Sequence, residues 1–174
     1  MAALKILVLS ILAAIGYGIA FDQVTARICV EYFTIGHPPI FATESPTLLA
    51  LGWGVLATWW VGLGLGLPLA FASLRGPWPR RDAAYLARPI ARLLVQMAAF
   101  AALAGTVGWL AARADYVFLL ARLAERVPQE RHDAFVADLW AHSASYLYGF
   151  VGGLLLIRRV WRERQAESRA RAIS

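Results

Sequence analysis

The stretch Ser45–Leu74, SPTLLALGWGVLATWWVGLGLGLPLAFASL, holds thirty consecutive residues without a charged side chain. A helix needs about twenty apolar residues to cross the hydrocarbon of a bilayer, so this stretch predicts a membrane-spanning helix. The whole chain of 174 residues has the same character, because 60% of it is hydrophobic and its mean hydropathy is +0.58. Soluble domains are only about 45–50% apolar. We therefore expect an all-α membrane protein that forms a single domain over residues 1–174.

Three further charge-free runs accompany this stretch, at residues 6–21, 93–112 and 139–157. Together they predict four transmembrane helices, at about residues 5–22, 46–74, 91–113 and 137–160, followed by a tail at residues 161–174. The first run is the shortest. Its alternative interpretation is a signal peptide, cleaved after the small residues of Gly18-Ile19-Ala20.

The charges fall unequally on the two sides that these spans define. Lys5, residues 75–92 and residues 158–174 together carry 12 basic and 3 acidic residues, whereas residues 22–45 and 113–138 together carry 5 basic and 8 acidic residues. Basic loops face the cytoplasm and anionic lipid. We therefore expect both termini in the cytoplasm, and the arginine-rich composition favours a bacterial inner membrane. The net charge of +6 is explained by these flanks, so we expect the lipid bilayer, and no nucleic acid, as its partner.

Two segments are expected on the outward side. Residues 24–33 are rich in β-branched and aromatic side chains with polar residues at alternate positions, which favours an extended segment or a short strand. Residues 115–127 have apolar side chains at helical spacing, which predicts an amphipathic outer helix. Pro128 then starts the helix that contains the fourth span.

Several potential ligands gather beside the outer ends of the first and fourth spans. Asp138, His142 and Tyr146 are four residues apart and share one helix face. Ionisable groups at membrane depth usually face the bundle interior and are paired. Carboxylate and imidazole together suit zinc, iron, copper or manganese. The hypothesis is a transition-metal site, with a set of candidate ligands and three supporting residues: Asp22, Glu31, His37, Asp138 and His142, supported by Tyr146, Cys29 and His132.

Other functions stay open beside a metal site that supports catalysis. The same polar residues also suit a non-catalytic scaffold, in which Asp138 and His142 only fix helix packing. A transporter is the third possibility. The pairs Gly62/Gly66 and Gly149/Gly153 are small-xxx-small motifs, which favour helix contacts with a protein partner or with a second copy of the chain.

The pattern Tyr17-Gly18-x-x-x-Asp22-Gln23-x-Thr25, followed by Glu31-Tyr32-Phe33-Thr34, resembles a stretch in a family of small uncharacterised bacterial polytopic membrane proteins. The family pattern runs near His-Asp-Gln-x-Thr and then Ser-Pro-Glu-Tyr-Phe-Thr. Phe21 stands at the position of that histidine, and Cys29-Val30 stands where the family has Ser-Pro. The resemblance implies a polytopic membrane protein and implies no activity.

Overall fold

The computed structural model describes residues 1–173, and within them it contains helices and no strand. The elements in chain order are α1 (Ala2–Ile28), α2 (Val30–Thr34), α3 (Pro46–Leu56), α4 (Trp59–Leu74), α5 (Ala83–Arg113), α6 (Ala121–Arg126), a 3₁₀ turn (Gln129–Arg131) and α7 (His132–Ile173). In this described part of the chain, three helical segments are long and apolar enough to cross a membrane: Ala2–Ile28, Pro46–Leu74 and Ala83–Arg113. The all-α prediction is confirmed.

The fourth predicted span lies within α7, a helix of 42 residues. It is not one of the three segments that are apolar enough on length and hydropathy alone. The polar side chains of His142, Ser143 and Ser145 lie in its outer half. Two of them, His142 and Ser145, are buried against the other helices.

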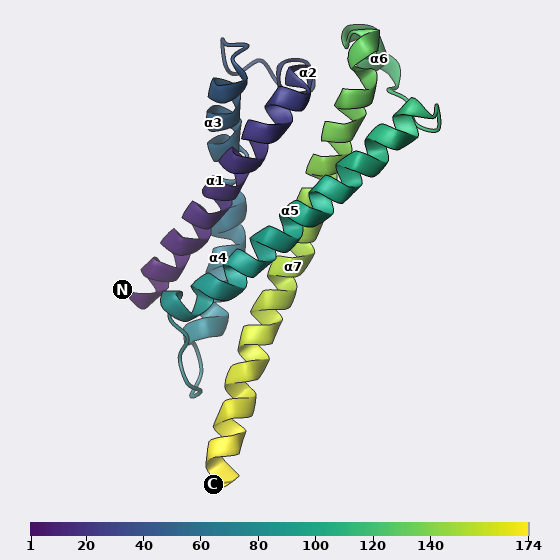
Figure 1. Cartoon of the computed structure of the whole chain (residues 1–174). Helices are drawn as coiled ribbons and strands as arrows, with labels where there is room; N and C mark the ends of the chain where they lie inside the picture. Colours follow the sequence, from purple (N-terminus) through teal and green to yellow (C-terminus); the bar gives the residue numbers. More distant parts are fainter. Residues whose placement is uncertain (174) are drawn as a thin grey trace.

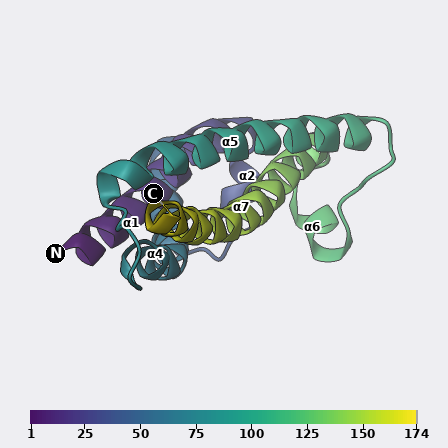
Figure 2. The same ribbon diagram turned by 90° about the horizontal axis from the view of Figure 1, so that it is seen from below.

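The long helices form two packed groups (Figure 1). In one group α1 lies along both α3 and α4, and in the other α5 packs along α7. Contacts of α4 with α7 and of α1 with α5 join the groups. In the view from below, α7 runs between α5 and α4 (Figure 2). The start of α1, the α4–α5 loop and the end of α7 lie at one end of the bundle, and α2 and α6 lie at the other.

Glycines allow the close approach of α1 to α3 and α4. A Cβ atom on Gly54 would lie 2.5 Å from the backbone nitrogen of Ile19, and a Cβ on Gly62 would lie 2.7 Å from the carbonyl oxygen of Ser10. The predicted small-xxx-small pairs are therefore used inside this chain. Gly62 and Gly66 face α1, while a Cβ on Gly149 would meet the sulfur of Met97.

The prediction of an extended segment at residues 24–33 is wrong. Helix α1 continues to Ile28, a single residue, Cys29, is extended, and α2 follows at once. A lone strand beside a membrane has no neighbour for its backbone groups, whereas a helix satisfies its own. Burial of Ala26, Tyr32 and Phe33 in one apolar cluster outweighs the preference of the β-branched residues for extended backbone.

The predicted amphipathic outer helix is shorter than expected. Only Ala121–Arg126 is helical, and the preceding residues 114–120 form turns and irregular backbone. Leu119 and Val127, on either side of α6, are buried in the apolar cluster that covers the outer end of α7. These two anchors hold the segment as a loop folded onto the bundle.

The helix of the second span is interrupted at Ala57 and Thr58. The N–H of Thr58 donates to the carbonyl of Val55, and the regular pattern resumes where the N–H of Gly62 donates to Thr58. The helix then continues through Pro68 to Leu74.

Arg164 fastens the opposite end of the bundle. Its side chain is fully buried and donates hydrogen bonds to the backbone carbonyls of Ala72, Trp78 and Pro79. The guanidinium also lies over the ring of Trp78. This one residue of α7 therefore holds both the end of α4 and the loop that leads to α5.

We expect Gly54→Ala to lower the free energy of unfolding by about 1–3 kcal/mol, because the added methyl group would overlap the backbone of α1. The matched control is Gly64→Ala, where no heavy atom lies within 4 Å of the new Cβ. Unfolding of both variants in mixed micelles, followed by circular dichroism, measures the difference. Equal stability of the two variants would contradict this account of the α1–α3 contact.

Candidate functional site

Asp22 of α1 and His142 of α7 meet between the two helix groups. Nε2 of His142 lies 3.3 Å from Oδ1 of Asp22, and the two residues are only 8% and 6% exposed. These are two of the five residues that the sequence analysis proposed as ligands. Their side chains form a polar contact between α1 and α7.

The hydrogen bonds of His142 fix how many protons this pair holds. Nδ1 of His142 lies 2.8 Å from the backbone carbonyl oxygen of Asp138, which can only accept, so Nδ1 carries a hydrogen and donates it. A bond between Nε2 and Asp22 then needs one more proton. It lies either on Nε2, as imidazolium, or on the carboxyl of Asp22. The pair therefore shares a single proton.

Asp138 contributes its backbone to this arrangement, but its side chain has a different environment. The residue is 1% exposed, and its Oδ2 atom has no hydrogen-bond partner among the described residues. An isolated ionised carboxylate is costly in such a place. The structure thus separates Asp138 from Asp22 and His142 in role, although the sequence placed all three in one ligand set.

His37 approaches the same place from the loop after α2. Its Nδ1 donates to the carbonyl of Tyr32 at 2.8 Å, so Nε2 is left as an acceptor. The ring stacks on Phe33 and packs against Trp53. Burial lowers the pKa of His37, which favours the neutral imidazole.

The remaining predicted residues are held elsewhere. Glu31 accepts from Nε of Arg131 at 3.1 Å, and the thiol of Cys29 donates to Glu31 at 3.4 Å. Burial raises the pKa of Cys29 to about 12, so the thiol stays protonated. His132 bonds through Nε2 to the carbonyl of Val127 at the start of α7. Tyr146, also on α7, is 47% exposed and lines the same cavity as Asp22 and His142.

These placements do not assemble a metal centre. Within residues 1–173, no three side chains of His, Cys, Asp or Glu converge closely enough to hold an ion. Glu31 is committed to Arg131, and one nitrogen of each histidine is committed to a carbonyl oxygen. This arrangement does not support the hypothesis of a transition-metal site.

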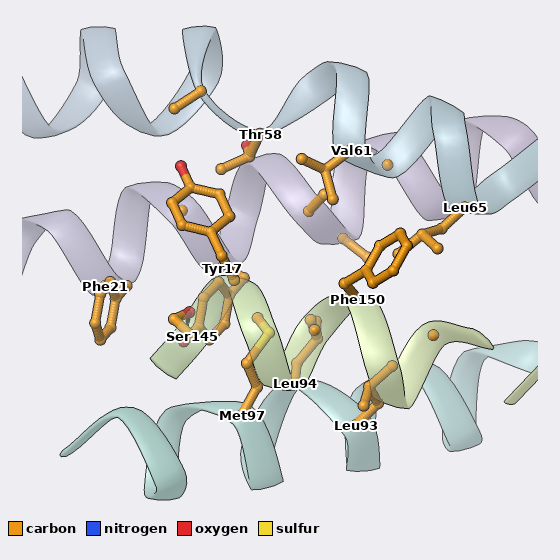
Figure 3. Close-up of a pocket in the computed structure, with 18 of the residues that line it drawn as sticks. Tyr17, Phe21, Thr58, Val61, Leu65, Leu93, Leu94, Met97, Ser145 and Phe150 are labelled. Atoms are coloured by element: carbon orange, nitrogen blue, oxygen red, sulfur yellow. Dashed lines mark hydrogen bonds between the residues drawn. The ribbon is translucent and has the colours of Figure 1, made fainter. Parts of the chain in front are cut away.

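A cavity extends from the Asp22–His142 pair along the interior between α1, α4, α5 and α7 (Figure 3). Its volume is about 140 Å³, far more than the about 10–15 Å³ that one water molecule needs. Figure 3 shows side chains from all four helices around this space, with Tyr17 beside Ser145 near one end and Leu65 and Leu93 toward the other.

The walls of this cavity change in character along its length. The outer end holds Asp22, His37 and His142, together with Tyr17, whose hydroxyl group lies 2.8 Å from Oγ of Ser145. The inner end is lined by aliphatic side chains: Leu65, Leu69, Ile90, Leu94, Leu156 and Ile157. From His142 to the level of Ile157 the cavity follows α7 for about 22 Å, at about 1.5 Å per residue.

Aromatic rings surround the polar end. Tyr32 stacks on His142 with 4.5 Å between ring centroids, and Phe21 meets the same imidazole edge-on at 4.9 Å. Phe21 therefore forms part of the wall of the cavity beside His142. Phe33 and Trp53 complete the enclosure.

The sequence analysis missed the cavity and most of its lining. Thr58, at the helix interruption, and Ser145 line it, as do Gly149 and Gly153 of the fourth span. The available signal was the series of small residues on α1, α4 and α7. It was interpreted as helix packing alone, because a sequence does not show whether two faces rich in small residues touch or leave a space.

The Glu31–Arg131 contact predicts how the stability of the fold changes at acidic pH. Although burial opposes ionisation, hydrogen bonds from its own backbone N–H and from Arg131 lower the pKa of Glu31. A carboxyl with a lowered folded-state pKa stabilises the fold above its ordinary pKa, about 4.3, and loses this contribution as the pH falls below it.

We therefore expect Glu31→Gln to cost about 1 kcal/mol of unfolding free energy at neutral pH. The difference from wild type should shrink as the pH falls through the lowered pKa of Glu31. Glu44→Gln, at an exposed position of the same loop region, controls for the change in net charge. A pH-independent cost of Glu31→Gln would mean that the ion pair is not its source.

Comparison with known proteins adds no assignment to this site. No family model matches the chain, and neither a curated protein nor a solved structure is similar to it.

Proposed function

We propose that this protein is a four-span bacterial inner-membrane protein that binds one long-chain amphiphile between its two helix groups. The polar head of the ligand lies at Asp22 and His142, and its hydrocarbon chain lies along the apolar part of the cavity. The observation that carries this proposal is the change of the cavity walls from ionisable and aromatic side chains to aliphatic ones over about 22 Å.

The dimensions support a lipid-like ligand. One leaflet of a bilayer contributes about half of its roughly 30 Å hydrocarbon thickness, about 15 Å. A chain of membrane-lipid length therefore accounts for most of the cavity's length of about 22 Å, and the polar head takes the rest. A polar solute would find few partners in the inner part of the cavity. A pocket lined mainly by apolar side chains, with a few convergent polar groups, is the usual form of a small-molecule site.

The interruption at Ala57 and Thr58 also supports a binding role. Irregular backbone at membrane depth is tolerated where it is buried in protein or lines a cavity, and both residues line this one. Trp59 and Trp60, which follow directly, are exposed on the outside of the bundle. The irregular backbone thus faces inward, and the large apolar rings face outward.

A scaffold function is the second candidate, and the Asp22–His142 contact favours it, because the contact links the two helix groups. In that case the pair only fixes helix packing and the cavity is filled passively by bulk lipid. The two functions differ in whether the cavity selects its occupant.

We expect reporter fusions to place the two ends of the bundle on opposite sides of the membrane. Fusions at the C-terminus and at Gly76 should give fluorescence of a cytoplasmic reporter, because these segments carry most of the basic residues. Fusions at Glu44 and Asp115 should give activity of a periplasmic phosphatase. Phosphatase activity at the C-terminus would contradict a fourth span in α7.

Filling the cavity should displace the amphiphile. Leu94 lines the cavity from α5, whereas the adjacent Val95 is exposed on the outer face of the same helix. We expect Leu94→Trp to reduce the lipid-like ligand retained after detergent purification at least about tenfold, a cost of about 1.4 kcal/mol in binding. Native mass spectrometry measures the retained mass.

Val95→Trp is the matched control, since it adds the same ring to the surface that faces lipid, and it should retain the ligand as wild type does. Equal retention by both variants, with folding unchanged, would contradict binding in the cavity and leave the scaffold function.

A further inference from the structure

The ionisable groups at the polar end of the cavity share one property: each presents an acceptor. His37 and His142 both line the cavity and donate Nδ1–H to backbone carbonyls. Nε2 of His37 is thereby left as an acceptor, and Nε2 of His142 becomes one when the proton that it shares with Asp22 leaves. The carboxylate of Asp22 accepts by nature. A ligand head that brings hydrogen-bond donors satisfies these three groups, whereas a head that brings only acceptors competes with them.

The charges that line the cavity also favour a ligand head that donates hydrogen bonds. In the described part of the chain, no lysine or arginine lines the cavity, and Asp22 is the one acidic residue in its wall. The buried carboxyl of Asp138 lies behind His142 and adds no positive charge. An anionic head group would therefore have no cation to pair with at this depth, and a cationic one has a carboxylate.

The surrounding rings also suit a cation. Phe21, Phe33, Trp53 and Tyr17 line the same end of the cavity as Asp22. Aromatic faces attract ammonium groups through the ring quadrupole, most strongly where water is excluded. Acceptors, a carboxylate and aromatic walls thus converge on one small volume.

We propose that the amphiphile carries a primary ammonium head, which donates N–H groups to Asp22 and to Nε2 of His142 in place of the proton that the pair otherwise shares. This inference rests on the proposed function and names the ligand class of the same cavity. One cation exchanges for another: the ammonium enters, one proton leaves to solvent, and the net charge of the site is unchanged.

The exchange makes binding depend on pH. Around the pair lie Tyr17 on α1, Tyr32 on α2, His37 in the following loop, and Asp138 and Tyr146 on α7. From α3, α4 and α5 the cavity is lined by uncharged side chains. Because the tyrosines stay neutral near neutral pH, the shared proton is the one that the ligand displaces, and binding should weaken as the pH is lowered.

The test uses the full-length protein in detergent with four probes of equal chain length: hexadecylammonium, hexadecyltrimethylammonium, hexadecanol and hexadecanoate. Isothermal titration calorimetry in two buffers of different protonation enthalpy gives the affinity and the number of protons released. We expect hexadecylammonium to bind about ten- to hundredfold tighter than hexadecanol, as for a charge-assisted hydrogen bond, with release of about one proton. The trimethyl probe, which has no N–H, should release none.

Asp22→Asn is the decisive variant, because its amide can still donate to Nε2 of His142 and keep α1 and α7 joined. It should lower the affinity for hexadecylammonium to that for hexadecanol. Glu44→Gln removes an exposed carboxyl that does not line the cavity and should preserve the preference.

The outcomes separate the two proposals. Tighter binding of hexadecanoate, or equal binding of hexadecanol and hexadecylammonium, with both lost in Leu94→Trp, overturns the ammonium head and leaves the cavity as a lipid site. Binding of all four probes that is unchanged in Leu94→Trp overturns the cavity itself.

Discussion

The contact between Asp22 and His142 is the constraint around which this bundle is organised. α1 belongs to one packed group of helices and α7 to the other, and this pair connects them by a buried polar bond. In a membrane the hydrophobic effect does not drive helices together, so packing of small residues and polar contacts must do so. Within each group glycines allow close packing, whereas between the groups the Asp22–His142 pair lies next to the cavity.

Two kinds of information decided what the sequence could predict. Charge-free runs and the distribution of arginines depend only on the properties of a bilayer, and they predicted the helical class. The spacing of Asp138 and His142 placed a polar face toward the bundle, and His142 does meet Asp22. Whether side chains form one cluster depends on tertiary packing. Glu31 therefore pairs with Arg131, whereas Oδ2 of Asp138 has no hydrogen-bond partner in the described part of the chain.

The helix interruption shows the same limit in the backbone. Proline at position 68 is tolerated inside α4, while Ala57 and Thr58, two unremarkable residues, end α3. Thr58 lies where α1 crosses this segment, next to Gly18 and Gly54. The crowding that fixes the break comes from a helix distant in sequence.

α7 is one uninterrupted helix from His132 to Ile173, about 60 Å long at about 1.5 Å per residue. That is about twice the thickness of the hydrocarbon that it is expected to cross. The tilt of a helix of this length is set by the contacts that hold it. His142 is held near one end and Arg164 in the farther half. Because α7 is uninterrupted between these two contacts, a change of its tilt at the first would also shift the second, which holds the end of α4 and the α4–α5 loop.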